Sequence, residues 1–150
     1  MQEIGLYGLG RMGGNMARRW SRGGIQVHAL NRSYEVTQKL AAEEAHITPC
    51  RTAQEMVAGL AAPRIVWLML PAGEATEAAI RELAPLLSPG DLLVDGANGF
   101  YQEAMRRSEH LHGLGLRFVD VGVSGGVWGL ANGYCLMAGG LEPDGARLKP

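Results

Sequence analysis

The sequence predicts an α/β fold, in which a doubly wound and mostly parallel sheet is covered by helices on both faces. Two observations predict this fold for a single domain of 150 residues. Apolar runs of strand length alternate with helix-like segments, and the first run leads directly into a glycine-rich turn and a helix. This order is typical of a Rossmann-like dinucleotide-binding domain.

Strand-length apolar runs recur along the chain, at residues 4–7, 25–30, 65–70, 92–94 and 118–121. We also expect short strands at 46–48 and 134–138. Helix-like segments lie between them, at residues 14–22, 34–43, 52–60, 73–87 and 101–114. Ser33 has the N-cap position of the second helix, Thr52 and Glu55 form a capping-box pattern, and Pro85 interrupts the fourth helix.

The first turn has the spacing of a phosphate-binding loop and contains Gly8, Leu9, Gly10, Arg11, Met12 and Gly13. Gly8 lets the chain turn off the strand, Gly10 lets a pyrophosphate approach the backbone, and Gly13 lets the helix pack on the strand. The free N–H groups at the start of the helix attract the anion. The alternative is a glycine-rich turn that binds nothing, and the strand before it and the helix after it argue against that.

The end of the second strand favours NADP over NAD as the cofactor. NAD-specific folds carry an acid there, about 20 residues past the glycines, whereas this chain has Asn31, Arg32 and Ser33. Arg32 can pair with a 2′-phosphate through its planar guanidinium, and its two neighbours can add neutral hydrogen bonds. Alternatively, Ser33 caps the next helix and Arg32 is only solvated; both interpretations can hold together.

Composition and charge exclude several other classes of function. The net charge of −1 and the dispersed basic residues do not suit nucleic acid, and Arg18, Arg19 and Arg22 are expected on the outer face of a helix. With no membrane-length apolar run and no secretory signal, we expect a cytoplasmic protein without membrane attachment. Cys50 and Cys135 are expected to be buried or partly buried thiols, and neither they nor the four histidines have metal-binding spacing.

Ligands bind at the carboxyl ends of the strands in such a sheet, so the residues at those ends are the candidate site. Beyond the first turn, these strand ends carry Leu70, Pro71 and Ala72, then Asn98 in the segment 95–99, then Ser124, Gly125 and Gly126. We expect them to converge on one cleft.

Three segments resemble the decarboxylating 6-phosphogluconate dehydrogenases of the 3-hydroxyacid dehydrogenase family, in particular their short-chain bacterial type. They are the glycine turn, the segment 95–98 followed by Tyr101, Arg106 and Arg107, and the segment 118–134. The resemblance covers nearly all of the chain. It departs from the family pattern at Ala97, where a second glycine is usual, and at Asn31, where short-form relatives often carry an acid.

The resemblance implies that residues 1–150 are an NADP-binding domain. The first turn would hold the pyrophosphate, residues 31–33 the adenosine ribose and its phosphate, and residues 70–72 would line the cofactor. Asn98 would lie between cofactor and substrate, and Ser124, Gly125 and Gly126 would bind the carboxylate and hydroxyls of a sugar-acid phosphate. A serine hydroxyl beside exposed N–H groups suits a carboxylate.

In that family, 6-phosphogluconate is oxidised at C3 and loses carbon dioxide to give ribulose 5-phosphate in the pentose phosphate pathway, with a lysine as the general base. Lys39 and Lys149 are the only lysines here and neither stands in the family's lysine motif, so we expect no catalytic residue in this chain. We also expect the family's all-helical C-terminal domain to be absent. We therefore expect a truncated cofactor-binding piece that is inactive alone and self-associates through uncovered apolar surface.

Two alternatives stay open. In the first, the chain is a stand-alone NADP-binding or sensing module. In the second, it is part of a dehydrogenase of a smaller 3-hydroxy acid.

Overall fold

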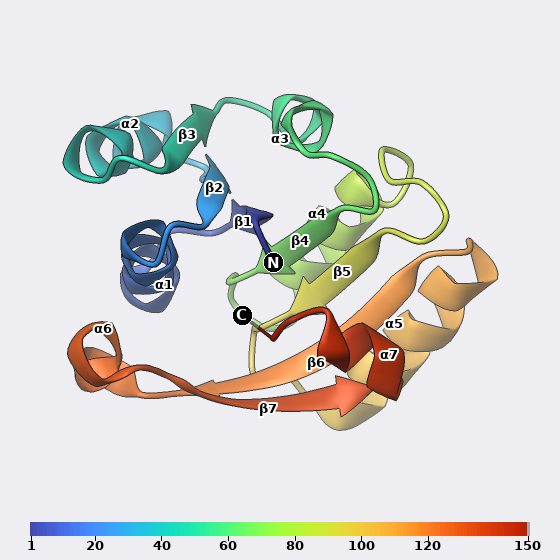
Figure 1. The fold of residues 1–150 in the computed structure, drawn as a ribbon. Coiled ribbons are helices and arrows are strands. Elements are labelled where there is room, and N and C mark those ends of the chain that lie inside the picture. Colours follow the sequence, from blue (N-terminus) through green and yellow to red (C-terminus); the bar gives the residue numbers. More distant parts are fainter. Residues whose placement is uncertain (150) are drawn as a thin grey trace.

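The computed structural model describes residues 1–149, which form a seven-stranded sheet with the order β3-β2-β1-β4-β5-β6-β7 (Figure 1). The strands are β1 (Glu3–Tyr7), β2 (Gln26–Leu30), β3 (Ile47–Cys50), β4 (Ile65–Leu68), β5 (Leu92–Asp95), β6 (Arg117–Ser124) and β7 (Cys135–Gly140). Strands β1 to β6 pair in parallel, and β7 runs antiparallel to β6. The predicted doubly wound, mostly parallel α/β sheet is confirmed.

Helices cover both faces of this sheet. They are α1 (Arg11–Arg22), α2 (Tyr34–Glu43), α3 (Ala53–Gly59), α4 (Glu74–Leu83), α5 (Tyr101–Gly113), α6 (Gly129–Asn132) and α7 (Glu142–Ala146), with a short 3₁₀ turn at Gly126–Trp128. Successive residues of β5 point into two separate cores: Leu93 packs with α3, α4 and α5, whereas Leu92 and Val94 pack in the core that α1 and α2 share. Because all three side chains are fully buried, each stabilises the fold by about 1.5–3 kcal/mol.

The β6–β7 hairpin brings distant parts of the chain together. The segment that joins its two strands contains α6, and α6 lies beside α1 (Figure 1). The segment that follows β6 is thereby placed next to the helix that follows the glycine turn.

Several element boundaries differ from those that the sequence predicts. Helix α1 begins at Arg11, before the predicted start, because Gly10 takes the N-cap position and its carbonyl accepts a hydrogen bond from the N–H of Gly14 at 2.8 Å. Strand β6 continues to Ser124, since Val119, Val121 and Val123 all turn into one core. The short helix α7 was not predicted.

The two predicted helix caps have different outcomes. Thr52 accepts a hydrogen bond from the N–H of Glu55 at 3.1 Å, as expected, but the Glu55 carboxylate accepts from the N–H of Arg51 rather than from Thr52. Ser33 lies at the N-cap position of α2, yet its hydroxyl donates to the Glu35 carboxylate at 2.8 Å and caps no backbone N–H. The predicted side-chain cap at Ser33 is wrong: the hydroxyl is turned toward the Glu35 carboxylate, and no backbone N–H donates to it.

The cysteines lie in different surroundings. Cys50 is buried, and burial raises the pKa of its thiol to about 11. Cys135 is exposed, contrary to expectation, because β7 is an edge strand whose residues are all exposed. Among residues 1–149, no helix is long and apolar enough to cross a membrane.

Candidate functional site

The glycine turn combines two positions that the fold requires with one that it leaves open. Gly8 has a φ of 105°, and a Cβ there would lie 2.3 Å from the carbonyl oxygen of Met69. A Cβ at Gly13 would lie 2.1 Å from the carbonyl oxygen of Gly8, so the helix can come this close to the turn only with glycine at position 13. A Cβ at Gly10 would meet no atom of the described chain within 4 Å. The space over Gly10 is therefore available to a ligand that approaches the backbone closely.

The other residues of the turn separate into core and surface. Leu9 is buried and Met12 half-buried, and both pack in the core on the α1 side of the sheet. Arg11 is exposed at the start of α1, which has no acidic residue in its first turn. A groove of about 490 Å³ opens here between α1 and α2, lined by Gly10, Arg11, Lys39 and neighbouring residues. The positive end of the helix dipole and these cations favour an anion at this edge.

Asn31 is used inside the fold. Its side-chain oxygen accepts a hydrogen bond from the backbone N–H of Leu9 at 3.0 Å, and its amide nitrogen donates to the carbonyl of Ser33 at 3.3 Å. The end of β2 is therefore tied to the glycine turn. One amide proton of Asn31 stays available to a ligand.

The neighbouring Arg32 is exposed and forms no hydrogen bond or ion pair with residues 1–149. Its guanidinium is thus free to meet an anion. Ser33, which is also exposed, donates to Glu35. The backbone hydrogen bond of Glu35 and this bond from Ser33 lower the pKa of the Glu35 carboxyl, so a negative charge lies beside the predicted phosphate position.

A contact that the sequence prediction missed lies close to Glu35. The Arg51 guanidinium, which follows β3, stacks over the Tyr34 ring at 3.9 Å from its centroid. A cation on an aromatic face is attracted by the ring electrons. Only the position of Arg51 directly after a strand could have drawn attention to it in the sequence.

Leu70, Pro71 and Ala72 follow β4 and are held against the glycine turn. The Leu70 side chain lies beside Gly8, where a Cβ would come within 3.0 Å of it. The buried hydroxyl of Thr76 donates to the carbonyl of Pro71 at 2.9 Å and fixes the turn into α4. Pro71 and Ala72 are exposed.

Asn98 joins the end of β5 to the end of β6. Its φ of 55° is unusual for a residue with a side chain. Its side-chain oxygen accepts from the N–H of Val123 at 2.9 Å, and its amide nitrogen donates to the carbonyl of Val123 at 3.2 Å. Ser124 follows directly and is exposed at the end of β6. Asn98 thus acts as a clasp that places the segment 124–126.

The segment 124–126 turns on two glycines in the left-handed region, Gly125 with a φ of 156° and Gly126 with a φ of 50°. A Cβ at Gly125 would lie 2.8 Å from the Tyr134 ring. The turn is therefore folded back on the residues that precede β7. Trp128, in the 3₁₀ turn that follows, is 72% exposed.

A buried ion pair lies next to the turn that carries Asn98. The interaction between these charges was not predicted from the sequence. Asp95 and Arg107 form an ion pair at 2.9 Å, with side chains 1% and 2% exposed. Burial opposes the charge of Arg107, but Glu77, Asp95 and Glu103 together raise its pKa. Burial also raises the pKa of Asp120, with a further contribution from Asp95 on the neighbouring strand. Arg107 shares a helix face with buried Ala104 and Leu111, a spacing that marks it as inward-facing.

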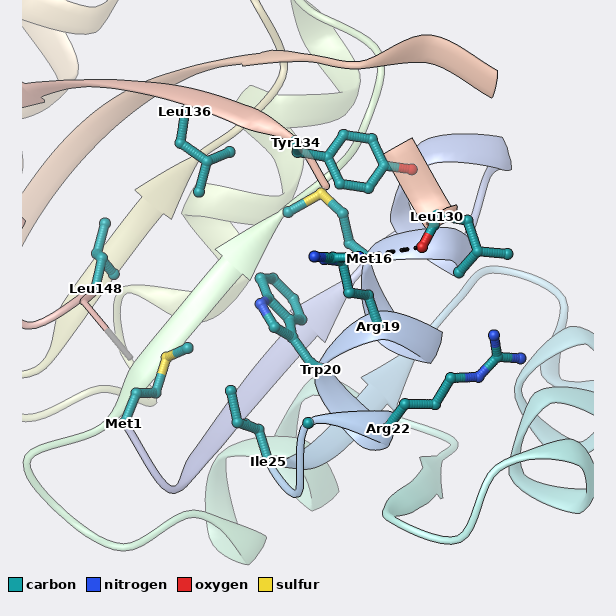
Figure 2. A pocket seen from close by; sticks show the side chains of 11 residues that line it. Met1, Met16, Arg19, Trp20, Arg22, Ile25, Leu130, Tyr134, Leu136 and Leu148 are labelled. Carbon is teal, nitrogen blue, oxygen red and sulfur yellow. Dashed lines mark hydrogen bonds between the residues drawn. The ribbon is translucent and has the colours of Figure 1, made fainter. Parts of the chain in front are cut away.

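An apolar groove of about 530 Å³ lies apart from the predicted site residues (Figure 2). Its lining comes from α1, the starts of β1 and β2, α6 and β7, and includes Met1, Met16, Trp20, Ile25, Leu130, Tyr134, Leu136 and Leu148. Arg19 of α1, expected on the outer face of the helix, donates to the carbonyl of Leu130 at 3.2 Å. The two arginines of the groove, Arg19 and Arg22, already bond to Leu130 and Glu44, so the groove offers a dinucleotide few free polar groups.

Within the part of the chain that the structure describes, no cluster of three His, Cys, Asp or Glu side chains is arranged to hold a metal ion. Neither lysine lies beside Asn98 and Ser124: Lys39 is on α2, where it lines the groove next to Gly10 at the far side of the sheet from β6, and Lys149 follows α7.

Contacts link the predicted residues into one continuous edge. The glycine turn touches residues 31 and 70, Gly99 lies next to Ala72, and Asn98 holds the residue before Ser124. What each residue binds stays a prediction.

Comparison with known proteins identifies relatives for this arrangement. Residues 3–150 match the family described as the NAD binding domain of 6-phosphogluconate dehydrogenase. A decarboxylating 6-phosphogluconate dehydrogenase of Synechococcus elongatus is 39% identical over 153 aligned residues, which cover 100% of this chain and 32% of that protein. The chain thus spans about a third of the length of this curated relative.

Two solved structures are similar in fold. Plasmodium falciparum 6-phosphogluconate dehydrogenase, described in its apo form and in complex with its cofactor NADP+ and with its substrate 6-phosphogluconate, has a TM-score of 0.88 at 32% identity. That similarity covers 95% of this chain and 31% of the other. Mycobacterium tuberculosis 3-hydroxyisobutyrate dehydrogenase has a TM-score of 0.87 at 28% identity, covering 100% of this chain and 50% of the other.

Proposed function

Because this chain belongs to the family of NAD binding domains of 6-phosphogluconate dehydrogenase, we propose that it binds NADP and serves the oxidative decarboxylation of 6-phosphogluconate. The observation that carries the proposal is the glycine turn. Gly8 and Gly13 are packed against backbone, whereas the space over Gly10 is open at the head of α1. An open backbone at a helix N-terminus suits a pyrophosphate.

The preference for NADP rests on Arg32. Its guanidinium has no partner among residues 1–149 and follows β2, where the 2′-position of the adenosine ribose would lie. A guanidinium recognises a phosphate by two parallel hydrogen bonds. The NADP+ named with the similar Plasmodium falciparum structure supports the same choice.

The residues at the other end of the cleft suit the reacting parts. Leu70, Pro71 and Ala72 would line the nicotinamide half of the cofactor, and Ser124, Gly125 and Gly126 would bind the substrate carboxylate and hydroxyls. The cofactor supplies a hydride acceptor when it is bound. Asn98 would lie between the two ligands and keep the substrate-binding segment in place through Val123.

Residues 1–149 supply binding and orientation but no identified general base. Lys39 lies on α2, on the other side of the sheet from β6. Lys149 comes two residues after Arg147, which bonds to carbonyls at the amino ends of β4 and β5, whereas Asn98 and Ser124 lie at the carboxyl ends of β5 and β6. A missing general base costs about 10² to 10⁴ in rate. The chain alone is therefore expected to bind the cofactor without appreciable turnover.

Titration calorimetry of the 150-residue chain tests this function. NADP+ should bind more tightly than NAD+, and 6-phosphogluconate should bind weakly in the presence of NADP+. Absence of affinity for either dinucleotide would contradict the proposal. Binding of NADP+ with no response to any sugar acid would favour a stand-alone sensing module instead.

A smaller 3-hydroxy acid is the second candidate substrate, and the similarity to 3-hydroxyisobutyrate dehydrogenase favours it. The same titration with 3-hydroxyisobutyrate in place of 6-phosphogluconate separates the two. Heat of binding with 3-hydroxyisobutyrate alone would identify the smaller acid as the substrate.

Exposed apolar side chains also support self-association of this chain. Trp128, Val127 and Met137 are each more than half exposed, and apolar surface of this kind marks an interaction face when it is continuous. Light scattering should report a mass above that of the monomer at high concentration. A monomer at every concentration would contradict self-association.

A further inference from the structure

One buried arginine connects three elements beneath the predicted site. The guanidinium of Arg107, on α5, contacts Asp95 at the end of β5 at 2.9 Å, Glu77 on α4 at 2.7 Å and Glu103 on α5 at 3.1 Å. All three nitrogens are therefore used, and the planar fork of the arginine spreads its donors over three separate atoms, whereas a lysine would present all of its donors from one nitrogen.

A network of this kind is a weak source of stability. Removing two charges from water costs several kcal/mol, and a hydrophobic side chain would often be as good. Arg107 lies on the same helix face as Ala104 and Leu111, where an apolar residue would pack well. The presence of Arg107 and its carboxylate partners is better explained by the positions in which they hold the backbone than by stability.

That geometry reaches the surface through Asp95. One carboxylate oxygen contacts Arg107, and the other accepts a hydrogen bond from the N–H of Ala97 at 3.0 Å. The bond to Ala97 closes a tight turn at the end of β5. The next residue, Asn98, has a φ of 55° and grips both backbone groups of Val123. A continuous path thus runs from Arg107 through Asp95 and the 96–98 turn to the end of β6.

We propose that Arg107 is a positioning residue that, by holding Asp95, fixes the turn from which Asn98 clasps Val123. Asparagine adopts the left-handed conformation more readily than other residues with a side chain, and the two bonds to Val123 hold Asn98 in it. The clasp in turn sets the start of the segment 124–126. The functional role of the Asn98 clasp rests on the proposed function, in which the segment 124–126 holds the sugar acid.

The proposal does not depend on catalysis for its test, because the clasp has its own spectroscopic signature. In the ¹⁵N-labelled chain, the side-chain amide of Asn98 is identified by its loss in Asn98→Ala. Its proton bonded to Val123, and the N–H of Val123 itself, should exchange slowly with solvent.

Arg107→Lys keeps the charge, but its donors all sit on one nitrogen and cannot span the three positions that the guanidinium reaches. We expect exchange at the Asn98 side chain and at Val123 to be at least tenfold faster, while the amides of Val66 and Leu93 in the central strands change less than twofold. The matched control is Arg106→Lys, because Arg106 also pairs with Glu77 but makes no contact with Asp95. It should leave both signals within twofold of the wild type.

Unchanged exchange at Asn98 in Arg107→Lys, or an equal effect of Arg106→Lys, would overturn the proposal. So would a parallel increase at Val66 and Leu93, because that describes general loss of stability. If Arg107→Lys does not fold, Asp95→Asn keeps the shape of the side chain and the bond from Ala97 while weakening the ion pair. It should speed exchange at Asn98 at least threefold.

A titration with NADP+ and 6-phosphogluconate on the same samples separates this inference from the proposed function. If 6-phosphogluconate shifts no signal of residues 124–126 in the wild type, the substrate assignment fails while the exchange data still decide the role of Arg107. If it shifts them, its affinity should fall at least fivefold in Arg107→Lys, with NADP+ affinity within threefold.

Discussion

The side-chain oxygen of Asn31 accepts a hydrogen bond from the backbone N–H of Leu9 at 3.0 Å, so the end of the second strand holds the glycine turn in place. A residue expected to face the ribose therefore also shapes the phosphate loop. The two roles can be separated by substitution.

Asn31→Ala leaves the buried N–H of Leu9 without its partner and should lower the free energy of unfolding by about 1–3 kcal/mol. NADP+ and NAD+ should then lose affinity equally, because the loop that they share is loosened. Asn31→Asp is the matched variant, since a carboxylate can still accept from Leu9. It loses the bond to the Ser33 carbonyl, so it should be less stable than the wild type but more stable than Asn31→Ala, and it should bind NADP+ at least tenfold more weakly than the wild type does. Thermal melting and calorimetry check both; a stable Asn31→Ala would show that the bond is dispensable.

Arg32→Ala should weaken NADP+ binding by about 10- to 100-fold, which corresponds to the loss of charged hydrogen bonds to one phosphate. NAD+ lacks that phosphate, so its affinity should stay within threefold. Arg81→Ala removes a guanidinium that is exposed on α4 and pairs with Glu74, and it serves as the control. Equal losses for both dinucleotides in Arg32→Ala would show that Arg32 does not distinguish them.

Glu35→Gln should change the affinity for NADP+ in the opposite direction. The Glu35 carboxylate accepts the hydroxyl of Ser33 and places a negative charge where the extra phosphate is expected. Its removal should tighten NADP+ binding by about threefold or more, with little change for NAD+, and the gain should shrink at high salt because the charge is exposed. A loss of NADP+ affinity would mean that Glu35 holds Ser33 in a productive position.

Two glycines of the turn give contrasting predictions. Gly13→Ala brings a Cβ to within 2.1 Å of the carbonyl of Gly8 and should lower the melting temperature by about 5 °C or more. Gly10→Ala meets nothing in the described chain and has an ordinary φ of −62°, so the melting temperature should hold. Gly10→Ala should nevertheless weaken dinucleotide binding at least tenfold. Undiminished binding would place the pyrophosphate elsewhere.

The carboxyl of Asp120 should make stability depend on pH. Burial and the neighbouring Asp95 raise its pKa, so the protonated form suits the folded state better than the unfolded state. The stability that this protonated form contributes is present at low pH and is lost as the pH rises through the folded-state pKa. Asp120→Asn should therefore raise the melting temperature by about 2 °C at pH 7 and have little effect near pH 3. An equal gain at both pH values would assign the effect to packing.

The sequence predicted the sheet well because its signals are local. Apolar runs such as residues 65–70 and the glycine at position 13 each depend on neighbours within a few residues. The direction of β7 was not predictable in the same way, since strand 135–140 could pair in either sense until the reach of the preceding turn was known. The exposure of Cys135 follows from that edge position.

The candidate site was predicted as a set of residues but not as a network. Asn31 and Asn98 were chosen for the ligands that they would contact, and the structure adds the backbone groups that they hold within the chain. Such bonds join residues more than twenty positions apart, and nothing in the local pattern encodes them. Arg107 was visible as part of a motif, and its spacing from Leu111 was the one sign that it points inward.

The clasp at Val123 uses its main-chain groups alone. Every amino acid except proline offers the same N–H and carbonyl, so the identity of residue 123 carries no weight in the attachment. Ser124 and the exposed residues beyond the two glycines, such as Val127 and Trp128, can therefore change, and with them the chemical preferences of the segment, while this attachment is kept. In such a scaffold, substrate selectivity can change while the hydrogen bonds that hold the loop stay the same.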